Sequence, residues 1–317
     1  MFTINNIETN GFSTVILKDT TSNTSAVIIP SCGGILHAFE VFHNNQLLNV
    51  IDSYQSQDDF NQHVTDKGFK SCKMSPFACR IKDARYEYEG KPYTIEKFLL
   101  NGSAIHGLLY DVPFKIIHQL ADENSATVII AYSYAGADKG YPFKYDCAVT
   151  YQLKTNNELV ISTLVTNKDE AAIPMQDGWH PYFTFGGKID DLLLEFQSKE
   201  QIEFDDAMVP TGKLVPFQEF GSLKKIETQT FDDCFSVNFF ECQPLCVLRD
   251  TLQKIQLEIR PDKSYPYLQI YTPPHRNSIA IENLSAIPDC FNNGIGLIIL
   301  PPNEKVEFVT SYTITAL

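Results

Sequence analysis

Four polar side chains lie where their surroundings in the sequence call for an explanation. Arg80 interrupts the apolar run FACRI, and Glu282 ends the apolar run of the segment IAIEN. A charged group in such a run costs free energy unless it is paired or faces a cavity. His106 lies beside a glycine in a turn, and His180 is surrounded by aromatic residues. Carboxylate and imidazole groups can exchange protons near neutral pH, so these residue types permit acid–base chemistry.

Each of these residues also has a structural explanation. Arg80 could be an ion-pair partner, and His106 could hydrogen-bond to the backbone of its own turn. His180 could be a core histidine packed by its aromatic neighbours, and Glu282 could bind the backbone of the loop that follows it. For any one residue alone the structural explanation is favoured. Their separation along the chain leaves open whether they meet in space.

The secondary-structure elements that must position these residues are predicted to be β-strands. Apolar and polar residues alternate with period two in Val128–Tyr134, Cys147–Leu153, Lys254–Arg260 and Val306–Ile314, which is typical of strands with one buried face. Glu158–Thr166 is apolar or β-branched on both faces, which predicts a strand buried between layers. No long segment shows a helical stripe, and 16 glycines and 17 prolines punctuate the chain. Many short strands with frequent turns predict an all-β sandwich or barrel.

The organisation of the chain predicts one large domain. Its 317 residues are 44% hydrophobic and 20% charged, which argues against disorder. The sequence has no glycine- or serine-rich linker, no abrupt change in composition and no repeat of fixed period. We therefore expect a single β-sandwich domain over residues 1–317.

The net charge and the N-terminal sequence indicate which partners and which cellular compartment to expect. The formal net charge of −14 repels phosphate backbones and anionic lipid surfaces, so neither nucleic acid nor a membrane is an expected partner. The first 20 residues lack a basic segment followed by a long apolar stretch, and the longest apolar runs are too short to cross a bilayer. These features predict a cytoplasmic protein.

The eight cysteines follow no disulfide framework. Cys242 and Cys246 form a single CxxxC with no second pair, and His37 and His43 are too loosely spaced to argue for a metal. Buried, reduced thiols are therefore expected rather than a zinc site or disulfides.

Seven segments, in this order, resemble motifs of the aldose 1-epimerase family. They are PSCGG (30–34), SPFACRI (75–81), NGSAIHG (101–107), GYP (140–142) with TYQL (150–153), GWHPYF (178–183), TFDD (230–233), and LQIYT (268–272) followed by Glu282 and Pro288–Asp289. The match runs from about residue 27 to the end. The resemblance implies a large antiparallel β-sandwich of the galactose mutarotase-like type.

The resemblance also implies roles for individual residues. His180 would be the general acid and Glu282 the general base, while Arg80, His106 and Asp232 would bind sugar hydroxyls. Mutarotation removes the proton of the anomeric hydroxyl and delivers a proton to the ring oxygen, so one acceptor and one donor suffice. The ring opens, the C1–C2 bond rotates, and closure on the other face gives the second anomer. This chemistry requires no cofactor and no metal.

The apolar face of a sugar needs an aromatic platform. Trp179 is the first choice because it precedes the proposed acid, and Tyr182 and Tyr271 are alternatives. The expected partner is a monosaccharide, and the expected assembly is a monomer or a homodimer.

Three departures from the family pattern bear on sugar preference. Cys79 stands where many members have asparagine, which removes an amide donor and acceptor. Leu108 replaces a second glycine after the histidine, and Asp233 follows Asp232, which leaves open which carboxylate faces the sugar. The proposed acid and base are both present.

Several functions compete on this sequence. The first is a mutarotase that acts on a free aldose such as glucose or galactose. A hexose-6-phosphate epimerase would need a cationic patch for the phosphate, and a sugar-binding homologue without turnover would be expected to lack His180 or Glu282. A glycosidase that uses Glu282 with Asp232 leaves the two histidines without a role.

Overall fold

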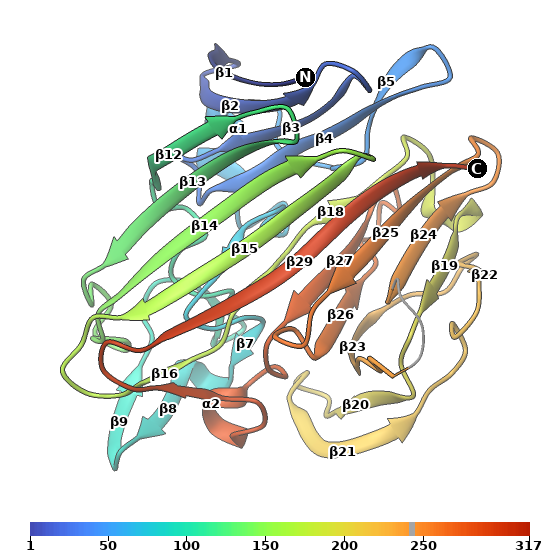
Figure 1. Ribbon diagram of the computed structural model, residues 1–317. Coiled ribbons are helices and arrows are strands. Elements are labelled where there is room, and N and C mark those ends of the chain that lie inside the picture. Colours follow the sequence, from blue (N-terminus) through green and yellow to red (C-terminus); the bar gives the residue numbers. More distant parts are fainter. Residues whose placement is uncertain (241–244) are drawn as a thin grey trace.

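The computed structural model describes residues 1–240 and 245–317, and strands dominate it (Figure 1). Every strand pairing among these residues is antiparallel. The prediction of an all-β antiparallel sandwich is confirmed, because two large sheets pack face to face.

Nine described strands form the largest sheet. Their order is β12 (Lys115–Ala121), β13 (Ser125–Tyr134), β14 (Tyr145–Lys154), β15 (Glu158–Asn167), β29 (Lys305–Ala316), β25 (Ile255–Pro261), β24 (Cys246–Asp250), β19 (Leu193–Phe196) and β22 (Lys224–Lys225). The four segments with period-two alternation correspond to β13, β14, β25 and β29 of this sheet. Their predicted strand character is confirmed.

The second sheet carries most of the residues of interest. Its order is β21 (Pro210–Pro216), β20 (Glu200–Phe204), β23 (Asp232–Ser236), β26 (Tyr267–Tyr271), β27 (Ile279–Leu284), β17 (Gly178–Trp179) and β6 (Lys73–Met74), with β18 (Tyr182–Phe183) also paired to β27. In Figure 1 it lies behind the β29, β25 and β24 end of the nine-stranded sheet.

Aromatic contacts join the two layers. The ring centroids of Phe183 and Tyr312 are 5.2 Å apart, and those of Phe196 and Phe235 are 4.7 Å apart. One continuous cluster of buried apolar side chains extends from Phe2 to Ile314. Burial of this apolar surface is the main force that holds the layers together.

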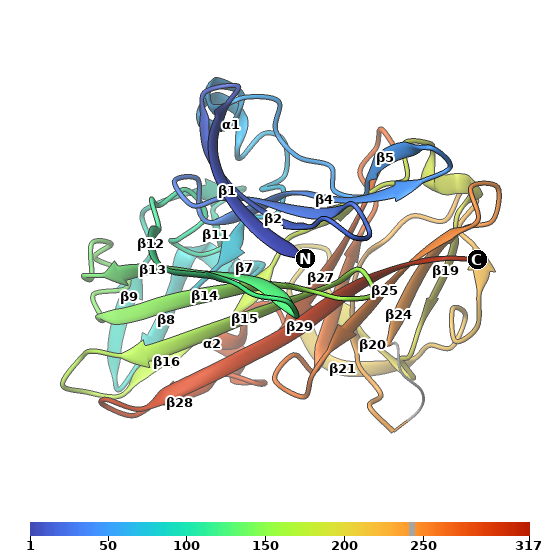
Figure 2. The ribbon, with the colours of Figure 1, turned by 45° about the horizontal axis from the view of Figure 1, so that its top comes forward.

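A five-stranded N-terminal sheet covers one end of the sandwich. It contains β1 (Phe2–Thr9), β2 (Phe12–Asp19), β3 (Thr24–Ile29), β4 (Ile35–His43) and β5 (Gln46–Asn49) in sequence order. Figure 2 shows β1 and β2 over the β12–β13 edge, and β2 contacts both β13 and β14.

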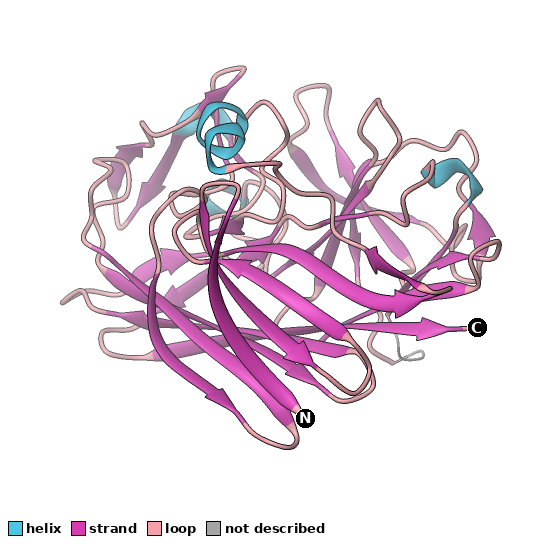
Figure 3. Ribbon diagram, turned by 90° about the horizontal axis from the view of Figure 1, so that it is seen from above, coloured by secondary structure: helices cyan, strands magenta, loops and turns pink. Residues whose placement is uncertain are grey.

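Smaller elements connect the sheets. The remaining strands are β7 (Arg80–Ile81), β8 (Arg85–Tyr88), β9 (Lys91–Thr94), β10 (Leu99–Leu100), β11 (Ser103–Ile105), β16 (Ile173–Met175) and β28 (Ile298–Leu300). The helices are α1 (Gln57–His63), α2 (Cys290–Asn293) and the 3₁₀ turns Lys82–Ala84 and Ile189–Asp191, all of them short, as Figure 3 shows. None of the helices in the described part has the length and apolarity that crossing a membrane requires.

One strand differs from its prediction. Glu158–Thr166 was expected to be buried on both faces, but β15 alternates between buried and half-exposed residues. Val160 and Leu164 lie on the half-exposed face, next to β14 and β29. The prediction was wrong because an apolar side chain on a sheet need not be buried, whereas a buried position does select an apolar one.

Candidate active site

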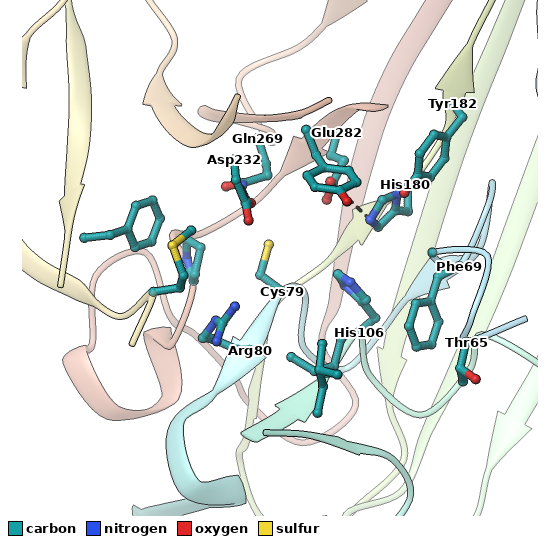
Figure 4. Close-up of a pocket in the computed structure, with 17 residues that line it drawn as sticks. Thr65, Phe69, Cys79, Arg80, His106, His180, Tyr182, Asp232, Gln269 and Glu282 are labelled. Atoms are coloured by element: carbon teal, nitrogen blue, oxygen red, sulfur yellow. Dashed lines mark hydrogen bonds and ion pairs between the residues drawn. The ribbon is translucent and has the colours of Figure 1, made fainter. Parts of the chain in front are cut away.

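A cavity of about 260 Å³ lies on the face of the eight-stranded sheet that points away from the nine-stranded sheet. Figure 4 shows the side chains that line it. Its lining comes from segments far apart in the sequence: Thr65, Gly68, Phe69, Cys79, Arg80, Leu100, Ile105, His106, His180, Tyr182, Phe204, Met208, Asp232, Gln269, Tyr271, Glu282 and Pro288. The volume is close to the lower end of the ~300–1,000 Å³ range of small-ligand pockets.

Strand alternation aims Glu282 into this cavity. On β27, Ile279 and Ile281 belong to the core between the sheets, so Glu282 on the opposite face points outward. Its side chain is 2% exposed, and its Oε2 has no hydrogen-bond partner among the described residues. Burial raises the pKa of this carboxyl well above its usual value, and the negative charge of Asp232 raises it further.

His180 follows β17, and neighbouring backbone fixes its position. Its N–H donates to the carbonyl of Cys72 at 3.2 Å, and its carbonyl accepts from the N–H of Ser71 at 2.8 Å. The imidazole stacks on Tyr182, with centroids 5.1 Å apart, and meets His106 edge-on at 4.8 Å. Its Nε2 lies 3.3 Å from Oε1 of Glu282. Burial lowers the pKa of His180 to about 4.

These two groups form a coupled pair. Burial disfavours both the imidazolium and the carboxylate, so a proton shared by the pair is favoured on Glu282 rather than on His180. The geometry lets the proton move between them. The pair therefore has one group that can accept a proton and one that can release it.

A tight turn brings His106 into the cavity. His106 has a φ of +57° and Gly107 a φ of +78°. The N–H of His106 donates to the carbonyl of Cys79 at 2.8 Å, and a Cβ on Gly107 would lie 2.5 Å from the carbonyl oxygen of Ser75. Burial, and then repulsion from the protonated form of His180 and from Arg80, hold the pKa of His106 well below its usual value. Its ring is therefore a neutral donor or acceptor.

Arg80 reaches the same cavity from β7. Its Nη1 donates to the carbonyl of Ala207 at 3.1 Å. A guanidinium carries five N–H donors, so others are available to a ligand. The positive charge of Arg80 opposes the effect of burial on the pKa of Asp232.

The structure distinguishes the two neighbouring aspartates. Asp232 lines the cavity, whereas the Oδ1 of Asp233 accepts from Nε2 of Gln201 at 2.6 Å outside it. Burial raises the pKa of Asp232 despite the Arg80 charge. Gln269 Nε2 donates to Oδ1 of Asp232 at 3.1 Å, while Gln269 Oε1 is buried without a partner among the described residues.

Gln269 is a buried polar residue of the cavity that the sequence analysis did not single out. It is a buried polar side chain at the centre of the apolar strand β26, where it pairs with Glu282 on β27. A polar residue in an apolar strand is the same signal that singled out Glu282. The signal was therefore present in the segment LQIYT.

The expectation that Trp179 forms the sugar platform is corrected. Trp179 is buried outside the cavity, packed edge-on against Tyr151 and under the ammonium of Lys73, 4.5 Å from the ring centroid. Trp179 ends β17 and belongs to the core cluster, whereas the next residue, His180, faces the cavity. Tyr182 and Tyr271 do line the cavity.

The described cysteines are unpaired, and the described residues contain no cluster of metal-ligating side chains. Six described cysteines are buried and unpaired, and Cys79 is unpaired and half-buried in the cavity. Cys242 lies outside the described residues. Within residues 1–240 and 245–317, no group of three or more His, Cys, Asp or Glu side chains is placed to hold a metal ion.

Comparisons with known proteins agree with this architecture. A sequence model of the family described as aldose 1-epimerase matches residues 16–313. The uncharacterized protein YihR of Escherichia coli K12 is 27% identical over 235 residues, which cover 72% of this chain and 73% of that protein. The maltose epimerase of Levilactobacillus brevis is 23% identical over an alignment of 326 positions, which covers 93% of each protein.

A solved structure shows the same fold. The crystal structure of a galactose mutarotase-like protein from Clostridium acetobutylicum superposes with a TM-score of 0.86 at 17% identity, and the match covers 100% of this chain and 99% of that one. At this identity the likeness establishes the fold, while the family match extends over nearly the whole chain. The chain therefore belongs to the aldose 1-epimerase family, with a fold of the galactose mutarotase-like type.

Proposed function

We propose that this protein is an aldose 1-epimerase that interconverts the α and β anomers of a free aldose such as glucose or galactose. The observation that carries the proposal is the 3.3 Å contact between His180 Nε2 and Glu282 Oε1 in a cavity with further polar side chains. Membership of the family supports an isomerase that acts on carbohydrates.

The proposed reaction is two coupled proton transfers. The Glu282 carboxylate takes the proton of the anomeric hydroxyl while the His180 imidazolium gives one to the ring oxygen. The bond between C1 and the ring oxygen breaks, and the free aldehyde forms. Rotation about C1–C2 and the reverse transfers close the ring on the other face. A positioned acid or base contributes ~10²–10⁴-fold in rate, and no cofactor is required.

The His180–Glu282 pair holds one proton before ring opening and one proton after it. Ring opening starts with the shared proton on His180 and leaves His180 neutral and Glu282 protonated. This final distribution is the one that burial of the two groups favours. The cavity would thus stabilise the stage at which the sugar is open, and the ion-paired form would be reached as the sugar binds.

The remaining polar side chains would hold the sugar. The Arg80 guanidinium and the Asp232 carboxylate offer a donor and an acceptor to neighbouring hydroxyls, since both line the cavity. Gln269 Oε1 is buried without a described partner and can accept from a hydroxyl, as can Nδ1 of His106. Each would exchange an unpaired state for a hydrogen bond when a sugar binds.

The competing functions have less support. A phosphorylated sugar needs cationic side chains, yet Arg80 is the only lysine or arginine among the described residues that line the cavity, and its charge already acts on Asp232. A binding protein without turnover gives no reason for the pairing of His180 with Glu282. The maltose epimerase among the relatives acts, by its name, on a disaccharide, which makes substrate size a specific question.

Anomer exchange measured by NMR tests the proposal. The protein is added to equilibrated glucose and to equilibrated galactose, and exchange between the α and β H1 signals is recorded against the uncatalysed rate. We expect catalysed exchange that is lost in Glu282→Gln and in His180→Asn. Catalysis that persists in both variants would remove the proposal. Sugar binding without exchange in the unaltered protein would support a binding function instead.

A further inference from the structure

The cavity has two chemically different ends. His180 and Glu282 form one end, and Figure 4 shows Cys79 between this pair and Arg80. The other end, which we call the distal wall, is apolar and consists of Phe204, Met208 and Pro288. A site that served a single small polar ring would gain little from this wall.

Hydrogen bonds place the distal wall on the Arg80 side. Arg80 Nη1 donates to the carbonyl of Ala207, next to Met208, at 3.1 Å. The carbonyl of Arg80 accepts from the N–H of Asp289, next to Pro288, at 2.9 Å. Arg80 is therefore flanked by both segments of the wall. The proton-transfer pair lies at the opposite end of the cavity.

The wall is ordered without a ligand. Phe204 ends β20 and packs against a cluster of buried apolar side chains that includes Cys234. The Asp205 carboxylate accepts from the backbone N–H groups of Ala207 at 2.9 Å and Val209 at 3.0 Å. The N–H of Met208 donates to the carbonyl of Asp205 at 2.9 Å. These bonds fix the turn, so the wall needs little reordering to receive a ligand.

The shape of a pyranose relates the two ends. C1 and the ring oxygen are adjacent in the ring, and C3 and C4 lie across from them. If Glu282 acts at the anomeric hydroxyl and His180 at the ring oxygen, the C3–C4 edge faces Cys79 and Arg80. A group attached to that edge would leave the ring towards the distal wall.

Cys79 offers a free hydroxyl at the C3–C4 edge only a weak hydrogen-bond partner. A thiol is a weak donor and a weak acceptor. Burial, and then the charge of Glu282, raise the pKa of Cys79 well above its usual value, so the thiol stays neutral. A hydroxyl there would lose a strong hydrogen bond, whereas a glycosidic oxygen has no proton to donate and loses less. The thiol thus favours a substituted position over a free one.

We propose that the distal wall is a subsite for a second sugar ring, so that the preferred substrate is a reducing disaccharide joined through O4 of the ring that is epimerised. The aromatic face of Phe204 and the thioether of Met208 suit the C–H face of a sugar. Asp205, next to Phe204, and Lys82, two residues after Arg80, are exposed and charged and can serve its hydroxyls. This inference rests on the proposed epimerase function.

The first experiment compares glucose with two disaccharides that differ in their glycosidic linkage. Exchange between anomers at equilibrium is measured by NMR for glucose, for maltose (4-linked) and for isomaltose (6-linked). We expect kcat/KM to be highest for maltose, because only a 4-linked ring leaves the cavity on the Arg80 side. Catalysed exchange of glucose with no preference for maltose over isomaltose would overturn the subsite and leave the epimerase function standing. No catalysed exchange of any of the three sugars would overturn the epimerase function itself.

The second experiment truncates single side chains of the distal wall. Phe204→Ala is expected to lower the ratio of kcat/KM for maltose to that for glucose by about tenfold, the loss of one aromatic contact of ~1.4 kcal/mol. Phe42→Ala, a change at an exposed phenylalanine of β4, is the matched control and should leave this ratio unaltered. Met208→Ala should lower the ratio in the same direction, and it replaces Phe204→Ala if that variant does not fold. An unaltered ratio in a folded wall variant would overturn the proposal.

A third variant tests the thiol. Cys79→Asn restores an amide at the C3–C4 edge and is expected to raise kcat/KM for glucose relative to maltose. The backbone of Cys79 has a φ of +52°, a conformation that asparagine adopts readily, so the variant should fold. A ratio that moves towards maltose would contradict the role assigned to Cys79.

Discussion

Two buried acid–base pairs lie on neighbouring strands of one sheet, and they are built differently. Lys73 on β6 pairs with Asp177 just before β17, and His180 just after β17 pairs with Glu282 on β27. The side chains of Lys73 and Asp177 are fully buried, while those of His180 and Glu282 are 6% and 2% exposed. Burial alone therefore does not distinguish them.

The lysine pair is enclosed and supported on several sides. Lys73 Nζ donates to Asp177 Oδ1 and to the carbonyl of Gly178, and it lies over the ring of Trp179. The hydroxyl of Tyr265 donates to Asp177 Oδ1 at 2.7 Å. Burial raises the pKa of Asp177, but the charge and hydrogen bond of Lys73 oppose that rise. The result is an ion pair held in place.

The histidine pair has no such support. Nδ1 of His180 and Oε2 of Glu282 lack described partners, and burial together with the Asp232 charge raises the pKa of Glu282. Asp177 Oδ2 is unpaired as well, yet it does not line the cavity. An unsatisfied buried atom therefore marks a candidate reactive group only where a cavity reaches it.

The largest effect expected from this contrast is loss of activity without loss of stability. Glu282→Gln removes the proposed proton acceptor, so the rate of anomer exchange should fall by ~10²–10⁴-fold. The free energy of unfolding should not decrease, because a neutral amide is easier to bury than a carboxyl that can ionise. NMR exchange and urea denaturation give the two quantities. A destabilised but active variant would contradict the division between the pairs.

The lysine pair should show the reverse behaviour. Lys73→Met leaves Asp177 buried without its cation, so the free energy of unfolding should fall by about 3–5 kcal/mol. The fraction that remains folded should keep more activity than Glu282→Gln. Urea denaturation and exchange per folded molecule measure both effects.

A double variant controls for this result. Lys73→Met with Asp177→Leu removes both charges and should recover much of the lost stability, since an apolar pair of similar volume can replace a buried ion pair. If the double variant is as unstable as the single one, the loss comes from packing and the assignment of a structural ion pair fails.

The dependence of kcat/KM on pH gives a smaller but more specific effect. The lowered pKa of His180, about 4, means that the pair gains a second proton only near pH 4. The raised pKa of Glu282 means that it keeps the shared proton at a pH where an exposed glutamate has lost it. Activity should therefore be level at weakly acidic pH and fall near pH 4, after subtraction of the uncatalysed rate. A fall centred near 6.5, the value of free histidine, would show that the two groups do not act as one buried pair.

The sequence predicted strands better than it predicted which side chains face the cavity. Local alternation identifies β13, β14, β25 and β29, because side-chain period depends only on neighbouring residues. The meeting of Arg80, His106, His180 and Glu282 depends on sheet pairings between distant segments, which periodicity cannot supply. The family resemblance supplied it instead.

Two residues show where sequence reasoning stopped. Trp179 was assigned to the cavity from its position beside His180, although strand geometry sends adjacent side chains to opposite faces. Lys73 was not singled out, because the mixed polar and apolar segment around it (70–75) shows no alternation and gives no sign of burial in the sequence. Its full burial becomes visible only when β6 pairs with β17.

The smallest expected effect concerns Trp179 itself. Trp179→Phe weakens the contact with the Lys73 ammonium, so the free energy of unfolding should fall by about 0.5–2 kcal/mol. The KM for the sugar should change by less than about twofold, a difference of under 0.5 kcal/mol, because the ring lies outside the cavity. Thermal denaturation and NMR exchange at several sugar concentrations provide these values.

Tyr271→Leu is the matched variant, since Tyr271 is a half-buried aromatic side chain that does line the cavity. Loss of a stacked ring, worth about 0.5–1.5 kcal/mol, should raise the KM by roughly two- to tenfold. If Trp179→Phe raised the KM as much as Tyr271→Leu did, the lysine pair and its tryptophan would belong to the sugar site. The separation of a supporting pair from a reacting pair on one sheet would then be wrong.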